Sequence, residues 1–72
     1  MYKITMTVRH GKTYVETAEG ATLDDAIQEL RKTALGVGYM PANPDNQLEL
    51  SDTLHAIGSV QIGWADYTAT MV

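Results

Sequence analysis

Apolar and polar side chains alternate over residues 2–9, the first clear pattern in the chain. A period of two predicts a strand with one buried face. His10-Gly11 then predicts a two-residue turn, because glycine tolerates the positive φ that such turns require. A second strand is expected over about residues 12–19, so the N-terminal part of the chain predicts a β-hairpin.

A two-residue turn also predicts the register of this hairpin. Met6 would lie opposite Val15, and both would join Ile4 and Val8 on the buried face. The other face would expose cations, hydroxyl groups and aromatic rings. Its expected members are Lys3, Thr5, Thr7, Arg9, Lys12 and Tyr14, with Tyr67 from the last strand.

A helical period replaces the alternation after Gly20. Thr22 is a good N-cap, and Asp25, three residues later, can return the bond in a capping-box-like arrangement. The helix is expected over residues 23–35 and should end at Gly36. Its apolar residues form one stripe at spacings of three and four: Leu23, Ala26, Ile27, Leu30 and Ala34. Burial of this stripe on the hairpin, at about 25 cal/mol per Å², is expected to hold the two elements together.

The next segment, residues 36–47, is rich in proline, glycine and asparagine, which predicts an irregular loop. Loops of this length are usually functional or mobile. Tyr39 and Met40 lie within it, where they would either cap the helix end or stand exposed as anchors for a partner. The pattern leaves both alternatives open.

The second half of the chain carries weaker signals. A short strand is expected over residues 48–50, followed by one or two helical turns that Ser51 caps and Gly58 closes. Alternation returns near the C-terminus, and the last residues are expected to pair into the sheet.

This C-terminal strand predicts the faces of three large side chains. Residues 60–64 place apolar side chains on one face, and Trp64 is assigned to the core. Continued alternation would put Asp66 on the same face and Tyr67 on the other, unless a bulge near Gly63 changes the register.

Together these patterns predict a single α+β domain over residues 1–72. Its antiparallel sheet would have three to four strands, with one main helix packed on one face. The expected element order is ββα followed by one or two strands.

Composition narrows the setting of this domain. The chain has 72 residues and no cysteine, so we expect a domain with one small core and no disulfides, whose stability is marginal. The absence of cysteine suits a cytoplasmic location, which is the expected one. No apolar run approaches the ~20 residues of a membrane helix, and the N-terminus lacks the apolar region of a signal peptide. The net charge is −4. The cations are concentrated in the hairpin, so a basic hairpin is expected on an acidic body.

Candidate chemistry is sparse. His10 and His55 lack partners at a metal-ligand spacing. The segment 43–54 fails as a calcium loop, because Leu48 stands where that loop requires glycine. Adjacent acids at the helix start diverge around the axis and are explained by capping. No hydroxyl has a base at a recognisable spacing. No metal, cofactor or catalytic role is therefore expected.

The sequence favours a non-catalytic protein-binding module, such as an inhibitor or regulator that covers a site on a larger protein, for example one that handles nucleic acid. The expected binding residues are Arg9, Lys12, Tyr14, Tyr39, Met40 and Tyr67. One alternative is an RNA or single-stranded DNA binder that uses the open sheet face, although the negative charge argues against it. Another is a structural homodimer built on that face.

Two resemblances accompany this hypothesis. Residues 11–33, which lead to Gly20-Ala21-Thr22-Leu23-Asp24-Asp25-Ala26-Ile27, resemble the strand–helix passage of HicB-type antitoxins over about a third of the chain. In size, acidity and lack of motif, the chain is also similar in type to phage-encoded inhibitors of bacterial defence, including anti-CRISPR proteins. These resemblances imply a small regulator and assign no individual residues.

Overall fold

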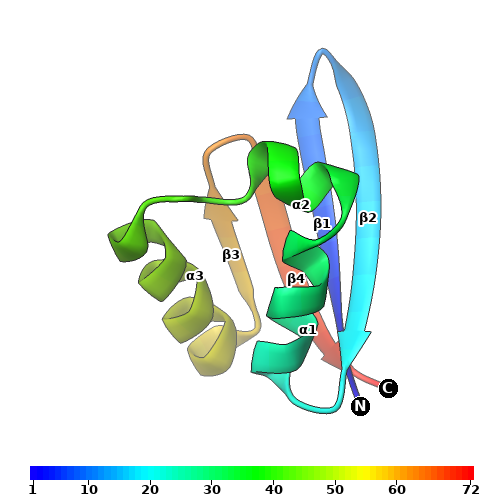
Figure 1. The fold of residues 1–72 in the computed structure, drawn as a ribbon, viewed down its shortest axis with the longest axis vertical. Helices are drawn as coiled ribbons and strands as arrows, with labels where there is room; N and C mark the ends of the chain where they lie inside the picture. The colour runs from blue at the N-terminus through cyan, green and yellow to red at the C-terminus, as the bar shows by residue number, and fades with distance from the viewer.

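The computed structural model describes all residues, 1–72, as four strands and three helices (Figure 1). Their bounds are β1 Tyr2–His10, β2 Lys12–Gly20, α1 Leu23–Arg31, α2 Ala34–Tyr39, α3 Pro44–Ile57, β3 Ser59–Ile62 and β4 Ala65–Met71.

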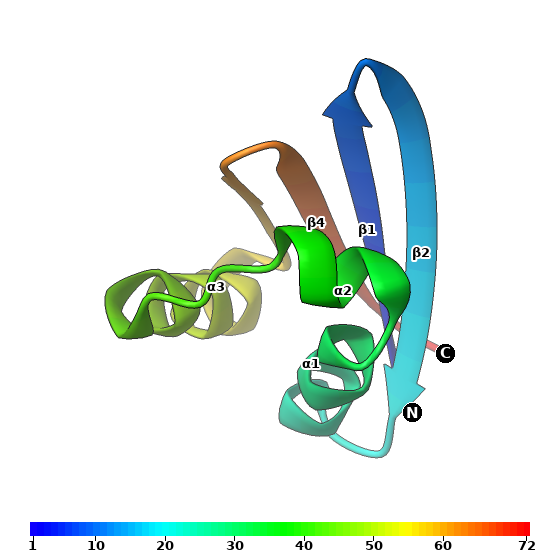
Figure 2. The ribbon, with the colours of Figure 1, turned by 45° about the horizontal axis from the view of Figure 1, so that its top comes forward.

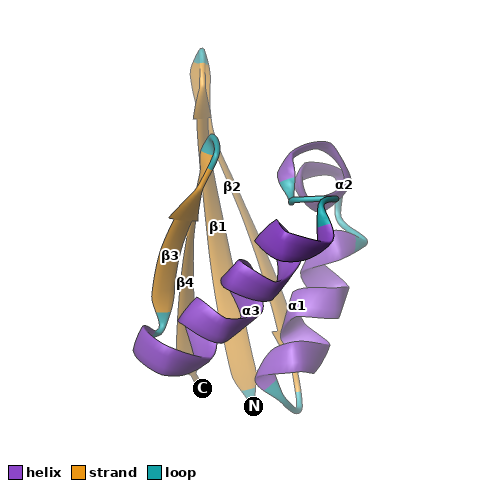
Figure 3. Cartoon of the chain, turned by 90° about the vertical axis from the view of Figure 1, so that its left-hand side faces the viewer, coloured by secondary structure: helices purple, strands orange, loops and turns teal.

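The strands form one antiparallel sheet in the order β2-β1-β4-β3, so β1 is an inner strand. All three helices lie on the same face of this sheet, and the other face is uncovered (Figure 3). The predicted fold class is confirmed: an α+β domain with an antiparallel sheet of four strands, two before the helical segment and two after it. Three helices, rather than one main helix, lie between β2 and β3. The longest helix is α3, however, and not the segment that the sequence marks most clearly.

The core lies between the sheet and the helices. Ile4, Met6 and Val8 are fully buried, as the alternating pattern of β1 predicts. The helices, the segment after α2, and β4 complete the core with Leu23, Ala26, Ile27, Leu30, Met40, Leu50, Leu54, Ala65 and Tyr67.

The β1–β2 hairpin pairs in a register one residue away from the predicted one. Only Gly11, at a φ of 79°, separates the paired residues His10 and Lys12, so the loop has an odd number of residues. Met6 consequently lies opposite Glu16.

This shift moves the β2 side chains to the faces opposite those expected, because side chains alternate along a strand. Val15, expected in the core, pairs with Thr7 on the open face and is 60% exposed. Lys12 and Tyr14, expected on the open face, share the helix side with His10 and Val8.

The start of α1 is as predicted, but its end is not. The Thr22 hydroxyl accepts a hydrogen bond from the Asp25 backbone N–H at 3.1 Å, while the Asp25 carboxylate returns none. The helix ends at Arg31 because Thr33 interrupts it: the Thr33 hydroxyl donates to the Leu30 carbonyl at 2.7 Å and caps α2.

Gly36, expected to terminate the first helix, is instead buried inside α2. A Cβ atom at this position would clash with the backbone carbonyl of Leu30, so only glycine allows α2 to approach the end of α1 this closely. The prediction of an irregular loop over residues 36–47 is therefore wrong at both ends, because α2 and α3 occupy them.

The segment after α2 forms one continuous helix rather than a strand and a short capped turn. Asn43 caps α3 by accepting from the backbone N–H groups of Asp45 and Asn46, and Pro44 occupies the first turn. Ser51, expected as the cap, lies inside the helix. Gly58 ends it in the left-handed conformation, at a φ of 80°, as expected.

The final strand is divided into two by a tight turn. Ile62 pairs with Ala65, and Gly63 has a φ of 60° in the intervening turn. Because the chain reverses at this turn, continued alternation does not hold: Tyr67 faces the core, and Asp66 faces the open side. The last residues join the sheet, as predicted, and the end of β4 pairs with the start of β1.

Candidate functional site

The β1–β2 hairpin projects past the helices at one end of the sheet, where the β3–β4 turn also lies (Figure 1, Figure 2). Three aromatic rings from separate elements meet there: those of His10 in β1, Tyr39 in α2 and Trp64 in the turn. The helix side of the hairpin adds a cation and a further ring. We name this end the apex surface, comprising His10, Lys12, Tyr14, Tyr39 and Trp64.

His10 lies at the centre of the aromatic group. Its ring stacks on that of Trp64, with centroids 4.5 Å apart and planes inclined by 16°. Tyr39 meets His10 edge to face, with centroids 6.0 Å apart, and its hydroxyl lies 3.3 Å from His10 Nδ1. Stacked and edge-to-face pairs are favourable arrangements of aromatic rings. The three rings therefore hold one another in place.

The backbone also restricts Trp64. Its carbonyl oxygen accepts a hydrogen bond from the Arg9 N–H at 3.2 Å, which ties the β3–β4 turn to the end of β1. The side chain nevertheless remains in contact with solvent, since Trp64 is 61% exposed. The assignment of Trp64 to the core is therefore wrong, because Trp64 follows Gly63 in the turn between β3 and β4, where its side chain is open to solvent.

The cations near the apex differ in their surroundings. Arg9 points to the open face, where its guanidinium pairs with the Asp66 carboxylate. Lys12 is exposed on the helix side and makes no ion pair. The two cations predicted to act together thus lie on opposite faces, and only Lys12 adds an unpaired positive charge to the apex surface.

The structure separates the six predicted binding residues into two groups. Lys12, Tyr14 and Tyr39 belong to the apex surface, and Arg9 borders it on the other face. Met40 and Tyr67 do not: they are 9% and 1% exposed and belong to the core. Met40 follows α2 and folds inward, which is the capping alternative considered for it.

His10 and Trp64 are the central residues that sequence reasoning missed. The local pattern predicts a turn at His10 and an inward-facing strand position for Trp64. Gly63 is the signal that could have located this turn, because glycine at the first position is typical of one class of two-residue hairpin turn. Alternation that continues across Gly63 instead predicts one unbroken strand, which hides the turn.

The open face of the sheet has a different chemistry. One row crosses all four strands with hydroxyl side chains only: Thr17, Thr5, Thr68 and Ser59. No aromatic side chain lies on this face, because Tyr14 and Tyr67 both point to the helix side. The base-stacking surface expected on the open sheet is therefore not formed.

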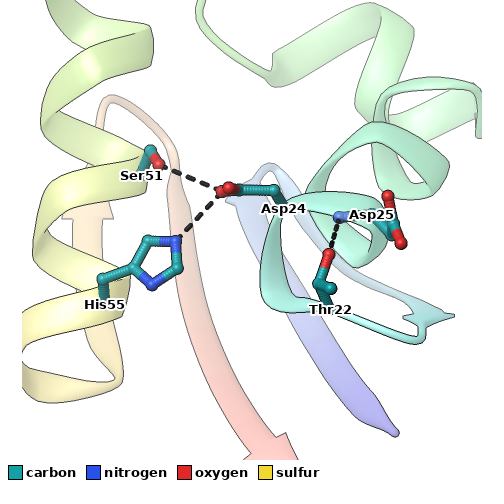
Figure 4. A network of polar contacts seen from close by, with 5 residues as sticks. All are labelled: Thr22, Asp24, Asp25, Ser51 and His55. Carbon is teal, nitrogen blue, oxygen red and sulfur yellow. Dashed lines mark hydrogen bonds and ion pairs between the residues drawn. The ribbon is translucent and has the colours of Figure 1, made fainter.

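A second polar cluster connects α1 with α3 (Figure 4). His55 Nε2 and the Ser51 hydroxyl lie 3.0 Å and 3.4 Å from the same carboxylate oxygen of Asp24. In a Ser-His-Asp triad, the serine bonds to the histidine, whereas both groups here converge on the aspartate. The cluster has the geometry of a link between two helices rather than of an activated nucleophile.

Comparison with known proteins provides no identification, since no family model, curated protein or solved structure matches the chain. None of the helices combines the length and apolar character needed to cross a membrane. No three acidic, histidine or cysteine side chains gather closely enough to share a metal ion. The exposed and mutually packed rings of the apex surface make it the candidate site that the geometry favours.

Proposed function

We propose that the chain is a small non-catalytic binding module that covers a site on a larger protein through the apex surface. The exposed but restrained ring of Trp64 carries this proposal. Tryptophan, tyrosine and arginine dominate the affinity of many protein interfaces. Covering the exposed part of such a ring removes apolar area worth about 2–3 kcal/mol from water.

The order within the apex surface supports the same proposal. A mobile side chain loses roughly 0.5–1.5 kcal/mol of rotamer entropy when a partner immobilises it. The Trp64 side chain is already restricted by its stack on His10. A larger share of the gain from apolar burial is therefore retained as affinity.

The charge near the rings indicates the partner's chemistry. Lys12 provides an unpaired cation beside the aromatic group, in a chain whose net charge is −4. A matching surface would present an apolar patch next to a carboxylate, since complementary charges favour correct docking. An inhibitor or regulator of a larger protein, including one that handles nucleic acid, fits this description.

The test compares two exposed apolar residues of equal accessibility. Trp64 and Leu48 are each 61% exposed, but Leu48 lies on α3, away from the apex. Tagged wild-type protein, Trp64→Ala and Leu48→Ala would be used to capture proteins from a bacterial lysate, with and without nuclease. Circular dichroism would first establish that all three are folded.

We expect one protein to bind the wild type and Leu48→Ala but not Trp64→Ala, and to resist nuclease treatment. With that partner purified, Trp64→Ala should weaken binding by about 30-fold, which corresponds to about 2 kcal/mol. Capture that persists with Trp64→Ala would refute the proposed surface. Loss of capture on nuclease treatment would instead indicate binding through a nucleic acid.

A further inference from the structure

The outer edge of β2 is a second surface that can accept a partner. β1 pairs with one side of β2 without interruption from Gly20 to Lys12, and no strand pairs with the other side. Backbone N–H and C=O groups of alternate residues therefore point outward without a strand partner. β2 also has no proline and no bulge, two features that commonly protect an exposed edge.

A shallow groove of about 670 Å³ lies beside the second half of this edge, between β2 and α1. Two exposed acidic residues of α1 line it, Asp25 and Glu29. Glu19 also borders the groove, but its pairing with Lys3 places its side chain on the open face of the sheet. The single cation in the groove, Lys32, is already paired with Glu29 at 3.2 Å. The surroundings of the free edge therefore carry net negative charge.

This negative charge favours a basic strand of a partner protein over a second copy of the chain as the occupant of the β2 edge. A second copy that paired antiparallel through β2 would bring its own Glu16 and Glu19 to the same interface. Like charges on adjacent strands destabilise pairing. A strand that carries lysine or arginine would instead be attracted to the carboxylates of this chain beside the β2 edge.

We propose that the β2 edge binds an extended segment of a partner protein that carries lysine or arginine at alternate positions. The segment would extend the sheet by backbone hydrogen bonds to β2. Its basic side chains on the helix side would lie toward the groove between β2 and α1.

The spacing of the carboxylates suits such a segment. Alternate side chains of a strand project to the same face about 6.5–7 Å apart. Asp25 and Glu29 are one helical turn apart on α1, a separation of about 5–6 Å between their Cβ atoms. Two basic side chains at positions i and i+2 can therefore pair with Asp25 and Glu29 together.

A peptide titration followed by NMR tests this proposal independently of the apex surface. The probe is a blocked seven-residue peptide in which lysine alternates with threonine. One control peptide replaces lysine with glutamate, and the other is N-methylated along the edge that would pair. We expect only the unmodified lysine peptide to perturb β2 and α1 resonances and to slow hydrogen exchange of the outward β2 amides.

Variants then separate the charge contribution from the backbone contribution. The double variant Asp25→Asn/Glu29→Gln should weaken binding about fivefold, as expected for two exposed ion pairs. The matched control Glu49→Gln/Asp52→Asn, on exposed positions of α3, should leave binding unchanged.

Three results would overturn the proposal. The first is equal binding of the N-methylated peptide, which would show attraction without strand addition. The second is the absence of any change in β2 resonances at about 1 mM peptide, a concentration at which a dissociation constant of about 1 mM would leave half of the protein bound. The third is protection of β2 amides that rises with protein concentration in the absence of peptide, which would assign the edge to a second copy.

Discussion

Tyr67 places a polar atom inside an otherwise apolar core. The residue is 1% exposed, and its hydroxyl is buried without a hydrogen-bond partner. Burial raises the pKa of Tyr67 to about 12, and the opposing effect of the Arg31 charge is smaller. A buried hydroxyl that makes no hydrogen bond reduces stability, because it has lost its contacts with water.

The variant Tyr67→Phe should therefore be at least as stable as the wild type. The ring keeps its packing, and removal of the unsatisfied hydroxyl should raise the free energy of unfolding by about 1 kcal/mol. Urea denaturation at neutral pH measures this difference. A clear loss of stability would mean that the hydroxyl is hydrogen-bonded in solution.

The same hydroxyl predicts a dependence of stability on alkaline pH. An unfolded chain ionises tyrosine near its ordinary pKa of 10.0, whereas folded Tyr67 ionises at about 12. The stability associated with this group is thus present below the unfolded pKa and is lost as the pH rises through the folded value, by about 3 kcal/mol in total. Urea denaturation at about pH 9 and about pH 11 should show Tyr67→Phe gaining stability relative to wild type as the pH rises. A constant difference would contradict the raised pKa.

At the scale of elements, the segments with strong local signals are those that the sequence predicts well. β1 has unbroken alternation, and α1 has a capping threonine followed by an apolar stripe. α3 lacks such a stripe, because Leu48 and Ile57 are exposed while Leu50 and Leu54 are buried. Its start signal, the Asn43-Pro44 pair, lies in a stretch whose composition indicated a loop.

The capping residue of α3 can be tested with a matched pair of variants. Asn43→Ala removes the side chain that accepts from two backbone N–H groups, and should lower the free energy of unfolding by about 1 kcal/mol. Ser51→Ala removes only a long, exposed contact to Asp24, and should cost less than about 0.5 kcal/mol. Thermal and urea denaturation compare the two. A greater loss for Ser51→Ala would contradict the observed helix start.

The pairing register of the strands is harder to predict than the strands themselves, because the register of each hairpin depends on the length of its turn. Because the loop contains only Gly11, Val15 pairs with Thr7 on the open face and not with Met6 in the core. The turn at Gly63 exchanged the expected environments of Trp64 and Tyr67. Alternation identifies which residues share a face, but a change of one residue at a turn reverses which face is buried. For this reason, the residues of the candidate site differ from those predicted, whereas the fold class is the predicted one.

At the scale of the whole molecule, the two ends of the described chain lie side by side (Figure 1). Tyr2 pairs with Met71, and the Val72 N–H donates to the Met1 carbonyl at 2.8 Å. The connection between α2 and α3 lies far from these ends in the sequence. Its Pro41 carbonyl accepts a hydrogen bond from Arg31 at 3.1 Å.

A circular permutant is therefore expected to fold. A short glycine-serine linker would join Met1 to Val72, and the chain would open between Pro41 and Ala42. The new carboxylate at Pro41 would remain beside Arg31, so we expect a thermal midpoint within about 8 °C of the wild type. Opening the chain within inner strand β1, between Thr5 and Met6, should abolish cooperative unfolding. Melting followed by circular dichroism checks both, and an unfolded Pro41 permutant would contradict the expectation.

The position of Trp64 means that intrinsic tryptophan fluorescence can report binding at the apex surface. It is the single tryptophan of the protein and lies outside the core, stacked on His10. Its emission should already resemble that of a hydrated indole in the native state, so unfolding would change its wavelength little. A ligand that covers the apex would move the emission to shorter wavelength. Intrinsic fluorescence of this protein therefore reports occupancy of one surface more sensitively than loss of the fold.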